Sequence, residues 1–513
     1  MLRMSPRLLR PFWPTCFVLA CLIVCSGQIH LRAAEPSAPK REVAVSYISW
    51  YSPVGALNGT KIWKQKGYDY QRAKQSGGIQ NYPLVPGVTF PESEPAVGSA
   101  DYYQLEKTAA RVVLGQMKSA GFDIVTFDMQ PLPDYDPAQP LTESNAPLAG
   151  FKTFLTWLPV AEKLGMKLAP NPDIWNFSGE TAGKIRTLDV AAWKRSLSGV
   201  LDLTPDSPAL WKIDGRPVII HFGSDCYKDH QRAAPQPGAP MPDAGWRQVL
   251  QELRTEGKKF FFIADIRPHD LAQEWNKIAD GVYAFSPASP LDGMKDQEIF
   301  QKAFTVPYLW TVSPGYYRGN VAYTEPNFGR IHETYVNAMK ANAQRMFVLT
   351  WNDYEEESDV GPTGSKGDCL LRIFAYYNEW FKSGQPPQAT KDTVIVAYPM
   401  RIPDQVTTKS PRYGKLKADL THDGSFVESP AYAPKAFYWA HVKAPTTLAL
   451  KGGDTVALPA GVSYGVLGPV SAGAVTATLG GKPQPLPPVA RIVKESQRKE
   501  EGGLEFRYVN LTE

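Results

Sequence analysis

The chain has 513 residues, of which 43% are hydrophobic and 21% charged, and its formal net charge is +4 at pH 7. This is ordinary globular composition, and the length exceeds the roughly 250–300 residues that one domain usually holds. The near balance of charge gives no reason to expect nucleic acid as a partner.

The N-terminus has the pattern of a secretory signal peptide. Three arginines precede the apolar run "CFVLACLIVC", which is too short to span a bilayer, and small residues follow it. We assign residues 1–34 to this signal, predict a secreted or periplasmic protein, and find no later stretch that would make a membrane span. A lipoprotein anchor at Cys21 is an alternative, disfavoured because it leaves a short hydrophobic region. Cys226 and Cys369 remain in the mature chain, and whether they pair stays open.

From about residue 43 to 385, short apolar runs alternate with amphipathic stretches. The strand candidates are "VAVSYIS", "DIVTFDM", "MKLAPNP", "RPVIIHF", "KFFFIAD", "GVYAFSP", "VPYLWTV" and "RMFVLTW". The clearest helices cover 101–121, 151–165, 243–257 and 329–344, and Gly121, Gly165 and Gly257 occupy the C-cap positions of three of them. Eight such pairs predict an α/β fold, a (β/α)8 TIM-type barrel over residues 35–385. A doubly wound sheet is the alternative, but no glycine-rich phosphate loop follows the first strand.

After about residue 390 the apolar residues alternate with period two, and Val, Thr, Gly and Pro are frequent. This pattern predicts a small all-β, sandwich-like domain over residues 386–513, joined to the barrel by "FKSGQPPQATKD".

Functional groups of barrel enzymes project from the C-terminal ends of the strands. The polar and aromatic residues at the predicted strand ends are therefore candidates for binding a substrate. They are Trp50, Asp128, Asp173, Trp175, His221, Asp265, Trp310, Tyr316, Trp351 and Asn352. Each has a structural alternative, such as capping a turn or covering the core. We expect at least two of the tryptophans to line one cleft, and the four polar side chains Asp128, Asp173, His221 and Asp265 to point into it.

The last predicted strand runs into "TWNDYEEESD", where five carboxylates fall within seven residues. Asp353 and Glu356 are three residues apart, so a helix-like turn would place them on one face. Two close carboxylates do not ionise independently, so one can serve as an acid and the other as a base. Glycoside hydrolysis requires such a pair. The alternative is an acidic capping segment before the next helix. We expect no metal and no cofactor, because His and Cys are too scattered for a zinc site, and neither a serine-hydrolase elbow nor a calcium loop appears.

The segment "VLTWNDYEEESDVGP" resembles the signature "TWNDYGESHYIGP" of glycoside hydrolase family 71, the α-1,3-glucanases or mutanases. "TVSPGYY", "IADGVYAFSP" and "VIVAYPMRIP" resemble further segments of that family in the same order, and the β-rich C-terminus resembles its last domain. Family 99 endo-α-mannosidases are more distantly similar, with two carboxylates at the same spacing. The resemblance implies that Asp353 and Glu356 are the catalytic pair and that the anomeric configuration inverts.

The sequence departs from that signature in chemical class at four positions. Glu355, Glu357, Ser358 and Asp359 stand where the family has Gly, Ser, His and Tyr. These changes add charge beside the acid and bear on the sugar specificity more than on the hydrolytic chemistry.

The resemblance implies a secreted glycoside hydrolase, most simply an endo-α-1,3-glucanase, acting on a polysaccharide or oligosaccharide. Glu356 is our first choice for the acid and Asp353 for the base, with the reverse left open. The alternatives are an endo-α-mannosidase-like hydrolase and a non-catalytic glycan-binding protein on the same barrel. The sugar, the linkage, the endo or exo mode, the role of the C-terminal domain and the oligomeric state stay open.

Overall fold

The computed structural model places Arg41–Glu513 in one compact unit. The residues it describes are 40–54, 83–89, 95, 99–132, 146–173, 190–224, 242–266, 271–285, 292–318, 321–323, 328–354, 358–403, 409–410, 414–415, 417–419, 426–428, 434–492 and 506–513.

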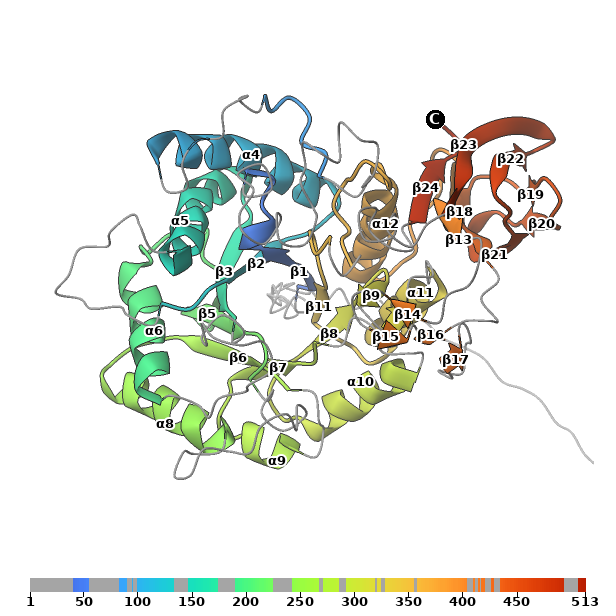
Figure 1. The fold of residues 1–513 in the computed structure, drawn as a ribbon. Coiled ribbons are helices and arrows are strands. Elements are labelled where there is room, and N and C mark those ends of the chain that lie inside the picture. The colour runs from blue at the N-terminus through green and yellow to red at the C-terminus, as the bar shows by residue number, and fades with distance from the viewer. Residues whose placement is uncertain are drawn as a thin grey trace, which may run out of the picture. The chain divides into compact units, whose positions relative to one another are not determined.

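A closed ring of parallel strands forms the centre of the unit (Figure 1). Within the described residues its eight strands are β1 (Glu42–Ile48), β2 (Ile124–Met129), β3 (Lys167–Pro172), β5 (Arg216–His221), β6 (Phe261–Asp265), β7 (Gly281–Tyr283), β8 (Tyr308–Val312) and β11 (Arg345–Val348). The first strand pairs with the last, with Val43 beside Met346. A parallel bridge between Asp173 and Phe222 closes the ring between β3 and β5. The predicted TIM-type barrel is therefore confirmed.

Helices surround the ring, one after each barrel strand (Figure 1). They are α4 (Ala100–Ser119), α5 (Ala146–Leu164), α6 (Val190–Leu203), α8 (Pro242–Thr255), α9 (Ala272–Trp275), α10 (Asp292–Ala303), α11 (Phe328–Lys340) and α12 (Cys369–Ser383), with a short 3-10 turn η1 (Ser49–Tyr51) directly after β1. The short β4 (Lys212–Ile213) pairs antiparallel with β5.

Glycine ends three of these helices, as the sequence predicts. Gly121, Gly165 and Gly257 have φ angles of 78°, 66° and 85°, in the left-handed region that residues with a Cβ adopt only at a cost. Each chain reversal leads into the next strand of the ring.

The two faces of each barrel strand pack in different cores. Residues such as Val45, Val125 and Ile219 pack outward against the helices. A separate hydrophobic cluster fills the lower interior with inward-facing side chains, namely Ala44, Ile124, Ala169, Trp211, Val218, Ile220, Phe261, Ile263, Tyr283, Leu309, Phe347 and Leu349. Because side chains alternate along a strand, the same inward face continues towards the C-terminal end through buried polar residues. These are Ser46, Thr126, Asp128, Asn171, Asp173 and Asp265.

Two sheets follow the barrel, and their strands pair antiparallel except for the parallel pair β13–β23. The first has the order β21-β18-β12-β24 and the second β13-β23-β22-β19-β20. Their strands are β12 (Thr393–Pro399), β13 (Arg401–Pro403), β18 (Lys435–Val442), β19 (Thr446–Leu450), β20 (Thr455–Leu458), β21 (Gly461–Pro469), β22 (Gly473–Leu479), β23 (Lys482–Ile492) and β24 (Phe506–Asn510). The predicted C-terminal β-structure is present.

The first of these sheets is buried on both faces. On β12, Val394 and Val396 join the cluster between the sheets, whereas Ile395 shares a cluster with the barrel helices. On β18, Trp439 belongs to the barrel-side cluster and donates from Nε1 to the Tyr377 hydroxyl on α12 (3.3 Å). The period-two pattern read from the sequence thus records two buried faces, and one of them is an interface with the barrel.

Shorter strands connect the barrel to the chain between β13 and β18. β9 (Tyr316–Arg318) and β10 (Val321–Tyr323) form a hairpin, and β10 pairs in parallel with β16 (Lys417–Asp419), which pairs with β17 (Phe426–Glu428). A two-stranded pair joins β14 (Lys409–Ser410) to β15 (Gly414–Lys415).

Two further expectations from the sequence concern membrane-spanning helices and the two cysteines. Among the described helices, none has the length and apolar character to cross a bilayer. Cys369 is a buried free thiol, and Cys226 lies outside the described residues.

We predict that replacing Trp439 by Ala lowers the stability of the barrel and the sheets together. Its indole is fully buried in the shared core, so truncation should cost about 3–5 kcal/mol. Differential scanning calorimetry should show one unfolding transition, shifted to lower temperature as a whole. Val466→Ala, at a side chain 51% exposed on β21, should leave it in place. Two separate transitions, with only one shifted by Trp439→Ala, would contradict a shared core.

Candidate active site

The acidic segment after β11 folds back on itself. The N–H of Thr350 donates to the carbonyl of Ser358 (3.0 Å), and the N–H of Val360 donates to the carbonyl of Thr350 (3.1 Å). Thr350 Oγ1 lies 3.2 Å from Ser358 Oγ and accepts a hydrogen bond from the N–H of Asp353 (2.9 Å). We call the paired segments 350–354 and 358–361 the acidic hairpin, with 350–354 as its first arm and 358–361 as its return arm. The two arms are hydrogen-bonded to each other at their base.

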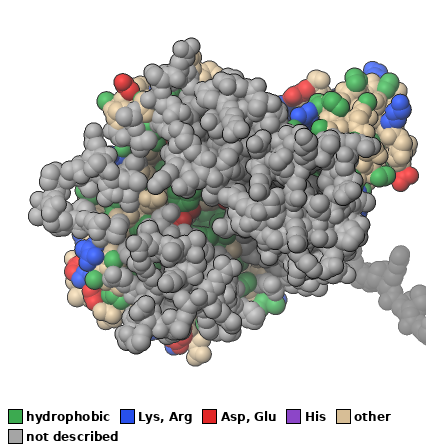
Figure 2. Space-filling model, in the orientation of Figure 1, with side chains coloured by type: hydrophobic (Ala, Val, Ile, Leu, Met, Phe, Trp, Pro, Cys, Tyr) green, Lys and Arg blue, Asp and Glu red, His purple; other side chains and the backbone are tan. Residues whose placement is uncertain are grey.

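Three carboxylates lie at the C-terminal end of the barrel, where the charges of two of them act on the third. Asp128 is on β2 and Asp173 directly follows β3, the neighbouring strand, and both lie on the inward face. Asp353 follows β11, on the other side of β1 in the ring. All three are buried, with exposed fractions of 7%, 4% and 7%. Figure 2 shows acidic atoms among hydrophobic side chains in a hollow near the centre of the barrel.

Burial and repulsion among the three carboxylates decide which of them is protonated. Burial raises the pKa of Asp128 well above its ordinary value, and the charges of Asp173 and then Asp353 raise it further. The like charges are therefore most easily relieved by a proton on Asp128. A neutral Asp128 next to two carboxylates is both a hydrogen-bond donor and an acceptor.

Three oxygens of this inward face have no hydrogen-bond partner within the described part of the chain. They are Oγ1 of Thr126, Oδ1 of Asp128 and Oδ1 of Asn171, and all three are buried. A buried acceptor without a partner is costly unless a ligand or water satisfies it. The floor of the barrel end therefore offers acceptors to a polar ligand.

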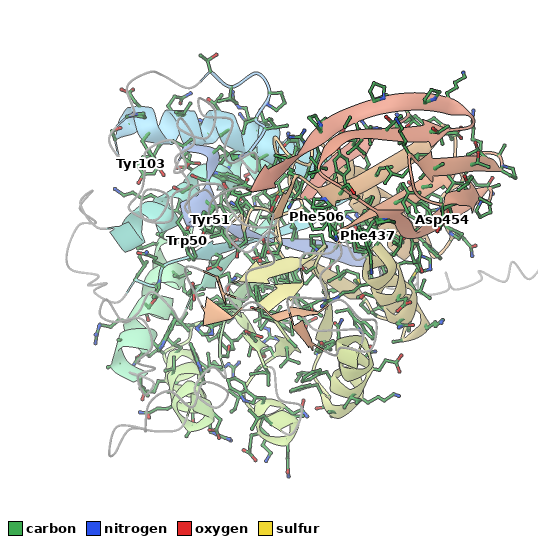
Figure 3. The ribbon with its side chains drawn as sticks, turned by 45° about the vertical axis from the view of Figure 1, so that its right-hand side comes forward. Trp50, Tyr51, Tyr103, Phe437, Asp454 and Phe506 are labelled. Carbon is green, nitrogen blue, oxygen red and sulfur yellow. The ribbon has the colours of Figure 1, made fainter. Side chains whose placement is uncertain are left out.

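Aromatic rings flank the carboxylates. Trp50 and Tyr51 form the turn after β1, with ring centroids 6.3 Å apart, and Figure 3 shows them side by side. The ring of Tyr51 meets that of Tyr354, which directly follows Asp353, edge to face at 6.2 Å. Trp50 is only half-buried, so among the tryptophans expected in a cleft it is the one whose indole keeps accessible surface in the described structure.

Asn352 has a structural role that differs from the expected ligand contact. Its Oδ1 accepts from the N–H of Ile48 (2.8 Å), and its Nδ2 donates to the carbonyls of Ile48 (2.9 Å) and Tyr51 (3.1 Å). The amide is 1% exposed and fully used by the backbone of the first strand. It joins the acidic hairpin to the turn after β1.

Asp265 likewise binds backbone instead of a ligand. Its two carboxylate oxygens accept from the N–H groups of Gly223 (3.0 Å) and Phe285 (2.7 Å). The side chain is fully buried. It ties together the ends of the strands on both sides of β6, which corrects the expectation that it contacts sugar.

His221 lies outside the barrel interior, which is a second correction. Its ring packs between Trp193 and Trp246, with centroids 4.7 Å and 4.5 Å away, and Nδ1 lies 2.8 Å from Ser224 Oγ. Burial lowers the pKa of this histidine to about 3, so the ring is neutral. Because Ile220 faces inward, its neighbour on the strand faces the helices.

Trp310 and Trp351 are also core residues, so two of the four tryptophans do not line a cleft. Trp310 is fully buried on the outward face of β8 and donates from Nε1 to Gln301 on α10 (2.5 Å). Trp351 is 3% exposed and packs edge to face on Phe122. A Cβ added to Gly361 would lie 2.8 Å from the Trp351 indole, so this position of the hairpin requires glycine.

The structure does not describe the side chains of three expected site residues. Trp175 and Glu356 lie outside the described residues. Tyr316 is in β9, where only the backbone is described. The partner expected for Asp353 therefore stays a prediction.

Two buried ionisable side chains are not predicted by any pattern in the sequence. Glu106 on α4 is fully buried, and it accepts from Ser52 Oγ (2.6 Å) and from Trp157 Nε1 (3.3 Å). Burial raises its pKa to about 7, against hydrogen bonds that lower it. The second is Lys366, whose ion pair is described below. A single charged residue in a helical or loop pattern normally predicts a solvated surface, so the sequence carries no signal for either.

In the described part of the chain, no three His, Cys, Asp or Glu side chains are grouped so that they could hold a metal ion. The arrangement supports proton transfer between carboxyl groups and hydrogen bonding to a polyhydroxylated ligand.

A protein-family model described as glycosyl hydrolase family 71 matches residues 187–490. An ascus wall endo-1,3-alpha-glucanase of Schizosaccharomyces pombe is 27% identical over 161 residues, which are 28% of this chain and 36% of that protein. The chain thus matches about a third of the length of this relative.

Solved structures with a similar fold include a family 99 endo-alpha-mannosidase from Bacteroides thetaiotaomicron. It has a TM-score of 0.46 and 15% identity, and the match covers 67% of this chain and 98% of that one. A modular endo-beta-1,4-mannanase from Cellulomonas fimi has a TM-score of 0.37 and 12% identity, covering 86% and 97%.

We predict that Glu106→Gln changes how stability depends on pH. The folded-state pKa of about 7 lies above the ordinary 4.5, so the stability that the protonated form contributes is complete in acid. It is lost as the pH rises through about 7, and the loss amounts to about 3 kcal/mol. Urea unfolding at about pH 4 and pH 8 should show the variant gaining on the wild type by this amount. Curves that stay parallel would mean that Glu106 does not titrate in this range.

Proposed function

Because the chain belongs to glycosyl hydrolase family 71, we propose that it is an exported endo-acting hydrolase of α-1,3-glucan, with Asp353 and Glu356 as its acid–base pair. The observation that carries the proposal is the position of Asp353. It is buried at the C-terminal end of the barrel, with Asp128 and Asp173 close enough for their charges to interact.

We assign the two roles from the chemistry that each step requires. Glu356 protonates the glycosidic oxygen as its bond to the anomeric carbon breaks, while Asp353 takes a proton from the water whose oxygen bonds to that carbon. The proton given up by Glu356 leaves with the new hydroxyl, and the one taken by Asp353 restores the pair through solvent. A single displacement of this kind inverts the anomeric configuration.

The neighbouring groups would bind the sugar. A neutral Asp128 can donate to one sugar hydroxyl, and the acceptor oxygens of Asp128 and Asn171 can accept from others. The accessible indole of Trp50 offers an apolar face for the C–H side of a pyranose ring. Asp173 and Asp353, if both ionised, would stabilise positive charge that develops at the anomeric centre.

The proposal extends to the organisation of the chain. We take residues 1–34 as an export signal, 35–385 as the catalytic barrel and 386–513 as the C-terminal β-domain. The apolar run between arginines and small residues supports the first of these assignments.

We predict that Glu356→Gln and Asp353→Asn each lower kcat on insoluble α-1,3-glucan by about 10²–10⁴-fold, because the first removes the proton donor and the second the proton acceptor of the transition state. Reducing-end release measures the rate, and circular dichroism checks the fold. Asp206→Asn, an exposed carboxylate paired with Lys212, is the matched control and should keep wild-type turnover. Wild-type-like turnover of Glu356→Gln would exclude this assignment.

The same assay distinguishes the alternatives when α-glucans of several linkages and α-mannans are supplied in parallel. Proton NMR of the first products should show the β-anomer released from an α-linked chain. Cleavage of mannan alone would favour the mannosidase alternative, and binding without cleavage would favour a glycan-binding protein.

We predict that Asp128→Asn extends activity to higher pH. The raised pKa keeps Asp128 neutral in the active range, and ionisation at higher pH adds a negative charge beside Asp353. An amide stays neutral, so the alkaline limb of the kcat/KM profile should move to higher pH while the acid limb remains. An unchanged alkaline limb would show that Asp128 does not control it.

A further inference from the structure

The return arm of the acidic hairpin ends in a buried ion pair. Lys366 Nζ lies 2.7 Å from Asp359 Oδ1, and the two side chains are 3% and 0% exposed. The same ammonium group lies 3.4 Å from the carbonyl oxygen of Asp359. Asp359 stands between Ser358 and Val360, the two residues that pair with Thr350. The ion pair therefore acts on the part of the return arm that contacts the arm carrying Asp353.

Lys366 is itself held in place by a tight turn. The N–H of Lys366 donates to Thr363 Oγ1 (3.3 Å), and the backbones of Thr363 and Gly367 exchange two hydrogen bonds, of 3.2 Å and 2.7 Å. The backbone of Lys366 is thus held by hydrogen bonds outside the hairpin.

The last strand of the C-terminal sheets supports this turn. The N–H of Tyr508 on β24 donates to the carbonyl of Ser365 (3.0 Å), next to Lys366. Arg372 on α12 pairs with both Asp368 and Glu513, which joins the start of α12 to the chain after β24. Phe506 on β24 and Phe437 on β18 are neighbours in the core shared with the barrel helices, as Figure 3 shows, with Asp454 farther out on the sheets.

We infer that Lys366 is a positioning residue for hydrolysis: through Asp359 it fixes the return arm of the acidic hairpin, and strand β24 holds Lys366 in place. The inference rests on the proposed function, because it takes Asp353 as a catalytic group. A continuous path of contacts connects the two, from Lys366 to Asp359, to Ser358, to Thr350 and to the N–H of Asp353.

The physical reason is that a buried ion pair fixes the relative position of its two side chains more than it adds to the free energy of folding. Desolvation offsets much of its attraction, so apolar residues of the same size often stabilise a fold as well. Such residues impose no defined distance, whereas an ammonium bound to a carboxylate does. Ser358 and Asp359 are two of the positions at which this chain departs from the family signature. Their contacts with Thr350 and Lys366 give both substitutions a role.

The test compares Lys366→Met with the double variant Asp359→Leu/Lys366→Met. The single variant leaves a carboxylate buried without its cation and should unfold at lower temperature. The double variant removes both charges at similar volume and should regain most of the stability. If the pair positions the hairpin, kcat of the double variant on α-1,3-glucan should still be about 10- to 100-fold below wild type, with KM nearly unchanged. Wild-type kcat in a double variant of normal stability would overturn the inference.

A matched control is Lys382→Met. Lys382 pairs with Asp123 at the same 2.7 Å, but at the amino-terminal end of β2, away from the hairpin. This variant should lose stability and keep kcat. A fall in kcat equal to that of the double variant would show that any lost ion pair has this effect.

Hydrogen exchange supplies a readout that needs no activity. The amides of Val360 and Gly361 bond to the carbonyls of Thr350 and Trp351, so they should exchange faster in the double variant and remain protected in Lys382→Met. Unchanged protection in the double variant would overturn the inference. A wild-type protein that cleaves no α-glucan would instead exclude the proposed function, while the exchange result still tests the positioning.

Discussion

The two-residue period of parallel strands in a closed ring decides which strand-end side chains can act together. On β2, Ile124, Thr126 and Asp128 share the inward face, so a carboxylate arrives at the barrel end above a polar and then an apolar layer. On β5 the same rule turns His221 outward, between two tryptophans. Closure of the ring then sets Asp128, Asp173 and Asp353 around the position of β1. Their repulsion, and the proton that relieves it, follow from geometry that no single strand contains.

Much of this architecture can be predicted from the sequence, because it depends on local patterns. Each predicted barrel strand overlaps an observed one, and the three glycines predicted to end helices have left-handed backbones. Strand ends were also correctly located, yet the facing of each side chain depends on its exact register. Trp310 lies one residue from an inward-facing position, so its side chain is buried in the core between the strands and the helices. The strand-end positions of Asn352 and Asp265 indicate a special role, but their partners are backbone groups of distant strands, which no pattern in the chain reveals. The sequence does not predict the burial of Glu106 and Lys366 for the same reason.

The C-terminal sheets and the barrel are joined more closely than a change of sequence pattern suggests. The alternation in "TVIVAYP" looks like one buried and one exposed face, but both faces are covered, one by the second sheet and the other by barrel helices. Contacts from β24 to the turn at Ser365 lie only a few residues beyond the acidic hairpin. The departures from the family signature occur in this hairpin, and the buried partner of Asp359 lies in the turn that β24 contacts. The departures from the signature and the contacts from β24 therefore involve the same group of interacting residues.

The bonds between Asn352 and Ile48 span 304 positions of the chain. During synthesis the first strand leaves the ribosome long before its neighbour β11 exists, so one edge of β1 stays unpaired until most of the barrel has been made. Contacts of such sequence separation form late, because the entropy of closing the intervening loop must be overcome first. The turn after β1 is held by the same asparagine that precedes Asp353. An incomplete chain therefore carries no assembled barrel end, and the site proposed around Asp353 forms only after the ring has closed.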